Sequence, residues 1–133
     1  MKNDKIEKTH TQWRTQLTTE QYRITRQKGT ESAFTGTYWN TKANGIYQCV
    51  CCDQPLYSSR TKFDSSTGWP SFWKAIDEDA LATQVDWSHG MKRSEVLCRR
   101  CGAHLGHMFG DGPAPTGQRH CINSASLKFV ATQ

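Results

Sequence analysis

Apolar positions in the first thirty residues follow a helical spacing. Trp13 and Leu17 lie four positions apart, so one helix face can pack on the rest of the protein. Two residue pairs have the capping-box spacing that starts a helix: Thr9 with Gln12, and Thr18 with Gln21. Gly29 offers a place for the last helix to end. The pattern predicts a helical N-terminal segment over residues 1–30.

From about residue 46 the pattern changes to short β-favouring runs bounded by Gly, Pro, Asn or Asp. The predicted strands cover residues 46–50, 84–87, 95–98 and 126–130. Pro70 should interrupt any strand near it, and we expect one or two helical turns over residues 71–76. Residues 110–117, rich in Gly and Pro, are predicted to form a loop. The sequence therefore predicts a mainly β, antiparallel fold with a core over residues 46–130, in a single domain of residues 1–133.

Composition and charge narrow the class of protein. Five Trp, four Tyr and five Phe can supply a core, although only 35% of the 133 residues are apolar. The net charge of +5 is spread over scattered Lys and Arg, as on a solvated surface, so we expect no nucleic-acid binding. The first residues lack the apolar stretch of a secretory signal, and no run reaches membrane-spanning length. We expect a cytoplasmic monomer, without membrane attachment, whose thiols stay reduced.

Four of the six cysteines form two Cys-x-x-Cys pairs, Cys49 with Cys52 and Cys98 with Cys101. Each pair places two thiolates on one tight turn, and two such turns complete the tetrahedron that zinc prefers. Four thiolates leave no position for water, so we expect one structural Zn²⁺ that clips two distant hairpins of one sheet. Cys51 is a third thiol in the first turn, but only Cys49 and Cys52 reproduce the spacing of the second pair. An iron centre, disulfides or four reduced thiols are the alternatives.

Cys121 is left as a candidate nucleophile, in the run Arg119-His120-Cys121-Ile122-Asn123. Alternate side chains of a strand share a face, so Arg119 and Asn123 would lie beside the thiol. A nearby guanidinium favours the thiolate, which is the reactive form of cysteine. An inert buried thiol is an equally open interpretation.

Two histidines and a tryptophan are the other candidates for chemistry. His104 and His107 are able to act as proton donors near the thiol, but two surface histidines give the same pattern. A metal-ligand role is disfavoured, because the four cysteines already satisfy one ion. Trp69, between Gly68 and Pro70, would be able to present its indole face to a methyl-thioether, although a plain core tryptophan is the simpler interpretation.

Six blocks of the sequence point to one family. They are Cys49-x-x-Cys52-x-x-Pro55-Leu56-Tyr57, Lys62-Phe63-Asp64-Ser65, Gly68-Trp69-Pro70-Ser71-Phe72, Ser88-His89-Gly90-Met91, Cys98-x-x-Cys101-Gly102-Ala103-His104-Leu105-Gly106-His107 and Arg119-His120-Cys121-Ile122-Asn123-Ser124-Ala125-Ser126-Leu127. In order and spacing they closely resemble the methionine-R-sulfoxide reductases of the B type (MsrB). The resemblance runs from about Thr18 to Phe129.

This resemblance implies two antiparallel sheets with flanking helices, and a zinc site remote from the active site. It implies as substrate the R epimer of methionine sulfoxide, free or in an oxidised protein. Cys121 matches the family's nucleophile, which attacks the sulfoxide sulfur and is left as a sulfenic acid. Trp69 matches the residue that packs on the ε-methyl group. His104, His107 and Asn123 match groups that organise water and hydrogen bonds around the sulfoxide oxygen.

One departure from the family concerns how the nucleophile is regenerated. Many members carry a resolving cysteine immediately before Gly-Trp-Pro-Ser-Phe, and this chain has Thr67 there. Cys51 is the only other unassigned thiol, and it adjoins the zinc ligands. The resemblance therefore favours an external reductant, either thioredoxin or a small thiol such as glutathione.

Two non-enzymatic interpretations compete with the reductase. One is a zinc-ribbon module that binds nucleic acid or protein, and the other is a purely structural zinc domain. Neither needs Cys121, Trp69 and the two histidines together.

Overall fold

The computed structural model describes residues 5–132 of the chain. Two short helices, α1 (His10–Gln16) and α2 (Thr19–Arg26), begin at the predicted capping boxes. In α1 the hydroxyl of Thr9 accepts from the backbone N–H of Gln12, and the Gln12 side chain accepts from the N–H of Thr9. Trp13 and Leu17 are buried, as their spacing predicts. The start of the predicted segment, residues 1–4, lies outside the described residues.

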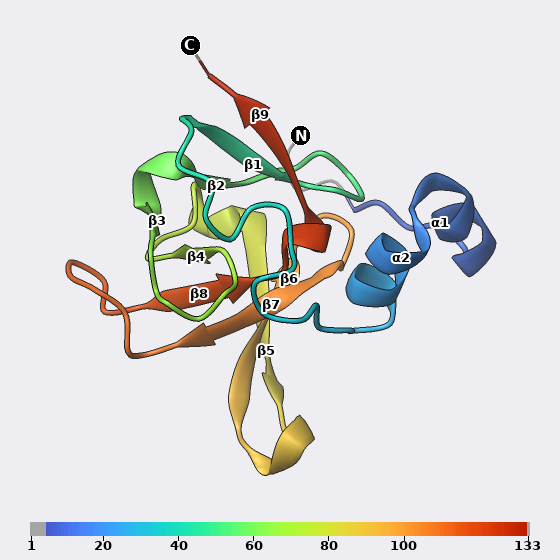
Figure 1. Cartoon of the computed structure of the whole chain (residues 1–133). Helices are drawn as coiled ribbons and strands as arrows, with labels where there is room; N and C mark the ends of the chain where they lie inside the picture. Colours follow the sequence, from blue (N-terminus) through green and yellow to red (C-terminus); the bar gives the residue numbers. More distant parts are fainter. Residues whose placement is uncertain (1–4, 133) are drawn as a thin grey trace.

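Within residues 5–132, nine strands form two antiparallel sheets (Figure 1). The strands are β1 (Gly45–Cys49), β2 (Pro55–Ser58), β3 (Lys62–Phe63), β4 (Ser71–Phe72), β5 (Leu81–Asp86), β6 (Arg93–Cys98), β7 (His104–Phe109), β8 (Arg119–Ile122) and β9 (Leu127–Ala131). The smaller sheet has the order β2-β1-β9 and the larger one β3-β4-β8-β7-β6-β5. Short 3₁₀ turns lie between strands: η1 (Ser59–Thr61), η2 (Glu78–Ala80), η3 (Ser88–Gly90) and η4 (Ser124–Ser126). The predicted mainly β fold with N-terminal helices is confirmed.

The local predictions had mixed outcomes. The four predicted strands appear as β1, β5, β6 and β9, and residues 110–117 contain no helix or strand, as predicted. The helical turns predicted over residues 71–76 are wrong, because Ser71 and Phe72 form β4. Ser71 pairs with Cys121 of β8, and Phe72 pairs with Lys62 of β3. Pairing on both sides in a sheet outweighs the weak local preference of these residues.

The core lies between the two sheets and is rich in aromatic rings. Tyr47 and Tyr57 of the smaller sheet and Phe72 of the larger one are fully buried. The rings of Tyr57 and Phe72 stack with centroids 4.3 Å apart. The Tyr57 hydroxyl lies 2.8 Å from Nδ1 of His120, so this polar pair is satisfied inside the core. This packing fixes the position of β8, the strand that carries Cys121.

The segment that connects α2 to β1, residues 27–44, lies against the end of the larger sheet (Figure 1). Its backbone is tied to the loop before β4, because the N–H of Phe34 donates to the carbonyl of Gly68 at 2.8 Å. Gly68 has a φ of +87°, and a Cβ there would approach the side chain of Ala33 to 2.8 Å. Only glycine fits this close approach.

Neither α1 nor α2, nor any other helix within residues 5–132, has the length and apolar character needed to span a bilayer.

Candidate metal centre and candidate active site

Four cysteine sulfurs converge at one end of the molecule. The Sγ atoms of Cys49, Cys52, Cys98 and Cys101 all lie within 4.8 Å of one another. Cys49 and Cys101 are 3.6 Å apart, and Cys52 and Cys98 are 3.5 Å apart. A tetrahedron with Zn–S bonds of about 2.3 Å has sulfur–sulfur edges of about 3.8 Å, so these positions fit one zinc ion. The donor set, four thiols and no open position, is that of a structural zinc site.

The metal site joins the two sheets, which corrects the expectation of two hairpins in one sheet. Cys49 ends β1 of the smaller sheet, and Cys52 lies in the turn that follows. Cys98 ends β6 of the larger sheet, and Cys101 follows it. Cys51 is buried nearby but is not part of the four-sulfur group.

A second site surrounds Cys121 on one face of the larger sheet. The thiol lines a cavity of about 250 Å³, together with the side chains of Trp69, His107, Arg119 and Asn123. Residues that lie directly opposite one another across the strands explain this arrangement. Cys121 of β8 pairs with His107 of β7, and Arg119 pairs with Phe109. The structure thus brings together four of the five residues expected around the substrate.

The Cys121 thiol has opposing influences on its ionisation. Burial raises its pKa above the ordinary cysteine value, and the charge of Glu31 acts in the same direction. The charge of Arg119, with hydrogen bonds from Thr67 and Arg119, counters that shift. Arg119 is held by two hydrogen bonds to Asp111, at 2.9 and 3.2 Å. The expected effect of the guanidinium is present, but burial outweighs it, and the pKa of Cys121 is raised overall.

A β-bulge explains how two histidines three residues apart can face the same side of a strand. Leu97 of β6 pairs with His104, but the preceding Val96 pairs with Gly106, so β7 carries one extra residue. The extra residue reverses the alternation of side chains between His104 and His107. Their rings consequently lie together, with centroids 5.5 Å apart.

The two histidines nevertheless differ in their access to the cavity. His107 lines it, and its Nε2 lies 2.7 Å from Oδ2 of Asp86, which leaves Nδ1 as the ring nitrogen free of that contact. His104 does not line it. Its Nδ1 lies 2.6 Å from the Glu95 carboxylate, and its Nε2 is buried without a partner among the described residues. Burial lowers the pKa of His104, and the hydrogen bond and charge of Glu95 oppose that shift.

Trp69 and Asn123 are fixed by the same neighbour. The indole Nε1 of Trp69 donates to the backbone carbonyl of Glu31 at 3.0 Å. The side-chain oxygen of Asn123 accepts from the backbone N–H of Glu31 at 3.0 Å. The amide nitrogen of Asn123 donates to the carbonyl of Leu105 at 3.1 Å. A primary amide has two N–H groups, so a second donor is available at the cavity.

Sequence reasoning missed several residues that build this site. Arg93 lines the cavity, Asp86 holds His107, and Glu31 holds Trp69 and Asn123. No sequence spacing marks these three residues, because strand pairing and the connecting segment bring them to the site from distant parts of the chain. Asp86, at the end of a strand and preceding a turn, gives no sign in the sequence that it binds a histidine.

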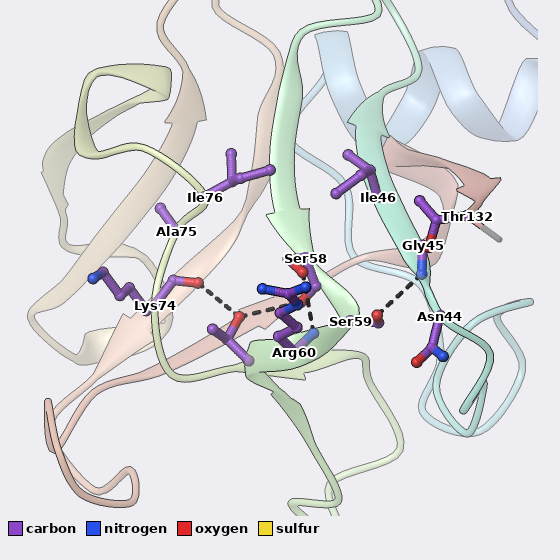
Figure 2. A pocket seen from close by; sticks show the side chains of 11 residues that line it. Asn44, Gly45, Ile46, Ser58, Ser59, Arg60, Lys74, Ala75, Ile76 and Thr132 are labelled. Atoms are coloured by element: carbon purple, nitrogen blue, oxygen red, sulfur yellow. Dashed lines mark hydrogen bonds between the residues drawn. The ribbon is translucent and has the colours of Figure 1, made fainter.

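A larger cavity, of about 760 Å³, lies elsewhere on the protein (Figure 2). Figure 2 shows Arg60 and Lys74 at this cavity and the Ser59 hydroxyl hydrogen-bonded to the backbone of Gly45. No cysteine, histidine or carboxylate is among the described residues that line it. Its lining therefore offers no thiol for attack on a sulfoxide and no imidazole or carboxylate to assist one, so volume alone is a poor guide to the chemistry of this protein.

Comparison with known proteins gives a consistent result. A family model described as the SelR domain matches residues 17–131. A peptide methionine sulfoxide reductase MsrB from Hahella chejuensis is 58% identical over 126 residues, covering 95% of this chain and 91% of that protein. The MsrB of Thiobacillus denitrificans is 60% identical over 122 residues and covers 92% of each chain. The chloroplastic reductase B1 of Oryza sativa is 63% identical over 126 residues, which are 94% of this chain and 58% of that protein.

The fold also occurs in a distant solved structure. The crystal structure of the Mis18 "Yippee-like" domain matches with a TM-score of 0.55, covering 68% of this chain and 98% of that one. The sequence identity is 17%, so the likeness concerns the fold alone.

Proposed function

Because the chain belongs to the SelR-domain family of peptide methionine sulfoxide reductases, we propose that Cys121 is the nucleophile of that reaction. The reaction reduces the R epimer of methionine sulfoxide to methionine. The proposal rests on the cavity in which the Cys121 thiol lies together with Trp69, His107, Arg119 and Asn123. Four thiols elsewhere hold the structural zinc, which supplies stability and no step of the chemistry.

The proposed step is a transfer of one oxygen atom between two sulfurs. The Cys121 thiolate attacks the electrophilic sulfoxide sulfur while the sulfoxide oxygen takes up a proton. A bond forms between Sγ of Cys121 and the substrate sulfur, and the protonated oxygen then passes from the substrate sulfur to Sγ as the S–O bond breaks. The sulfur–sulfur bond breaks in the same transfer, so methionine leaves and Cys121 remains as a sulfenic acid. Substrate sulfur is reduced by two electrons and the cysteine sulfur is oxidised by two, so the step balances without a metal.

The cavity residues divide the remaining tasks. Trp69 offers an apolar wall for the ε-methyl group of the substrate. Asp86 accepts from Nε2 of His107, so His107 would donate the proton to the sulfoxide oxygen from Nδ1 of its imidazolium form. Asn123 contributes its second amide N–H, because the first donates to the backbone carbonyl of Leu105. The ring of His104 packs against that of His107 and does not line the cavity, so we assign it a positioning role instead of contact with the substrate.

Regeneration of Cys121 requires an external thiol in this proposal. Thr67 occupies the position of a resolving cysteine and lines the cavity beside Cys121. Two reducing thiols convert the sulfenic acid to a thiol and water and leave as a disulfide. Thioredoxin or a small thiol such as glutathione would supply them.

We further propose that the whole chain, residues 1–133, acts as one domain and as a cytoplasmic monomer. All six cysteines are unpaired in the structure, which suits a reducing compartment. The scattered charge gives no basis for a nucleic-acid partner. Oxidised proteins and free methionine sulfoxide are both substrates in this proposal.

A single-turnover experiment tests the nucleophile. The zinc-loaded protein is mixed with R-methionine sulfoxide without reductant, treated with a sulfenic-acid probe and digested for mass spectrometry. The probe should label Cys121 in proportion to the methionine released. Release of methionine with no modification at Cys121 would refute the assignment.

A further inference from the structure

Glu31 is a buried carboxylate that no part of the reaction described above uses. Its relative exposure is 3%, and it lies in the connecting segment, residues 27–44. One carboxylate oxygen, Oε1, accepts from the backbone N–H of Ala125 at 2.9 Å. The other, Oε2, is buried without a partner among the described residues. Burial of an unpaired carboxylate oxygen costs stability, so its retention calls for an explanation.

The contact with Ala125 is the one that a helix cap would normally make. Asn123 is the N-cap residue of η4, and an N-cap side chain usually accepts from the second or third N–H of the turn. Asn123 makes no such bond. Glu31 accepts from Ala125, the second residue of η4, in its place. The turn is therefore capped by a residue from a distant part of the chain.

Because Glu31 caps the turn, the side chain of Asn123 is free to face the cavity. Its oxygen is occupied by the N–H of Glu31, and one amide hydrogen is used by the carbonyl of Leu105. If Asn123 capped its own turn, its oxygen would point toward the N–H of Ala125 and the amide group would rotate. The capping carboxylate thus decides where the free N–H of Asn123 points.

The backbone of the same residue also fixes the opposite wall of the cavity. The carbonyl of Glu31 accepts from the indole N–H of Trp69. The side chain is held tightly from behind, because a Cβ at Gly36 would come within 2.2 Å of Oε2 and 2.5 Å of the Ser124 hydroxyl. One anchored residue therefore sets the positions of both Trp69 and Asn123.

We propose that Glu31 is a positioning residue for sulfoxide reduction, which aligns Trp69 and Asn123 by capping η4 with its buried carboxylate. This inference rests on the proposed function. Trp69 receives the methyl side of the sulfoxide and Asn123 its oxygen side, so their relative placement decides which epimer fits. Loss of the anchor should reduce the turnover of the R epimer and weaken discrimination against the S epimer.

Three variants test the proposal with zinc-loaded protein and separated epimers of a blocked methionine sulfoxide. Glu31→Ala removes the cap, and kcat/KM for the R epimer should fall by about tenfold to a hundredfold. Gly36→Ala keeps Glu31 but displaces its carboxylate, and should lower the same constant. Glu31→Gln keeps an oxygen for the N–H of Ala125 and should recover most of the activity.

The controls separate positioning from loss of fold. Thr9→Ala removes a cap of the same kind from α1, and should lower the melting temperature while leaving epimer selectivity unchanged. The fall in kcat/KM caused by Glu31→Ala should be smaller in an Asn123→Ala background than in the wild type. In that background the Asn123 amide, which Glu31 is proposed to align, is already absent.

The proposal is overturned if Glu31→Ala and Gly36→Ala both retain wild-type kcat/KM and selectivity. It is also overturned if the effects of Glu31→Ala and Asn123→Ala are fully additive. Wild-type protein in the same assay keeps this outcome distinct from failure of the proposed function, because an inactive wild type would contradict the reductase itself.

Discussion

At the scale of single residues, Cys121 is a buried thiol whose reactivity depends on a few neighbours. Burial raises its pKa, while Arg119 and Thr67 act against that shift. The thiolate is the deprotonated form, so a raised pKa moves its appearance to higher pH. Arg119 in turn depends on Asp111, which binds it with two hydrogen bonds.

Replacement of Arg119 should make Cys121 harder to ionise. In Arg119→Ala the positive charge and its hydrogen bond are lost, so the pKa of Cys121 should rise further and the thiolate should form at more alkaline pH. The rate of iodoacetamide alkylation at Cys121, followed by mass spectrometry across pH, measures the midpoint. Arg119→Lys keeps the charge and should restore part of the shift. An unchanged midpoint in Arg119→Ala would show that the guanidinium does not act on this thiol.

A cysteine in place of Thr67 should change how the enzyme is regenerated. Thr67 and Cys121 line the same cavity, and the Thr67 hydroxyl contributes a hydrogen bond to the thiol. In Thr67→Cys one turnover without reductant should yield a disulfide with Cys121, detectable as a cross-linked peptide. The matched Ser66→Cys variant, one position away and exposed, should give much less of it. Equal cross-linking in both variants would argue against the loop geometry.

At the scale of elements, β7 brings two histidines to one face and gives them different surroundings. The bulge between Val96 and Leu97 makes this possible. Glu95 accepts from His104 at 2.6 Å and from Gln84 at 2.7 Å. These bonds tie the strands β5, β6 and β7 together behind the cavity.

Loss of Glu95 should destabilise this face of the sheet. In Glu95→Ala the buried N–H of His104 loses its partner, and the amide of the exposed Gln84 loses its bond to the same carboxylate, which should lower the free energy of unfolding by about 1–3 kcal/mol. Urea unfolding of the zinc-loaded protein measures this loss of stability.

The stabilisation by Glu95 should depend on pH. Burial opposes ionisation of Glu95, but the hydrogen bonds from Gln84 and His104 lower its pKa overall. Its contribution is therefore present above the pKa of the unfolded chain and lost as pH falls through the lower folded value. The exposed Glu78→Ala serves as control, and an equal loss in both variants would contradict the role of Glu95.

Some of these elements could be predicted from the sequence, and the reason is physical. The caps of α1 and α2 are local, since each box spans four residues, and both were predicted. The strand β4 depends on partners far along the chain, so Pro70 and its neighbours suggested helical turns instead. The metal ligands could be predicted because two Cys-x-x-Cys spacings are short-range signals. The roles of Glu31 and Asp86 depend on tertiary contacts and left no such signal.

At the scale of the whole molecule, the metal site and the cavity share one sheet but lie apart. Cys98 is three residues beyond Glu95 on β6, which is about 10 Å along the strand. Cys121 is two strands away from Glu95, about 10 Å across the sheet. The zinc clamp joins the ends of the two sheets, so its expected effect is on stability.

Removal of one zinc ligand should therefore unfold the protein more easily without a direct effect on Cys121. Cys98→Ser should lose the metal and lower the melting temperature by about 10 °C or more. Zinc content by elemental analysis, together with thermal unfolding, measures both effects. Cys51→Ser, which changes a buried thiol outside the four-sulfur group, should keep one zinc per chain. A Cys98→Ser protein with full zinc and normal stability would show that the metal site is misassigned.

The central claim is that Cys121 carries out the reduction of the R epimer. The most direct test compares separated R and S epimers of a blocked methionine sulfoxide, with dithiothreitol as reductant, in wild-type and Cys121→Ser proteins of equal zinc content. We predict R-selective turnover in the wild type and no turnover above background in the variant. R-selective turnover that persists in zinc-loaded Cys121→Ser, or its absence in the folded wild type, would contradict the account.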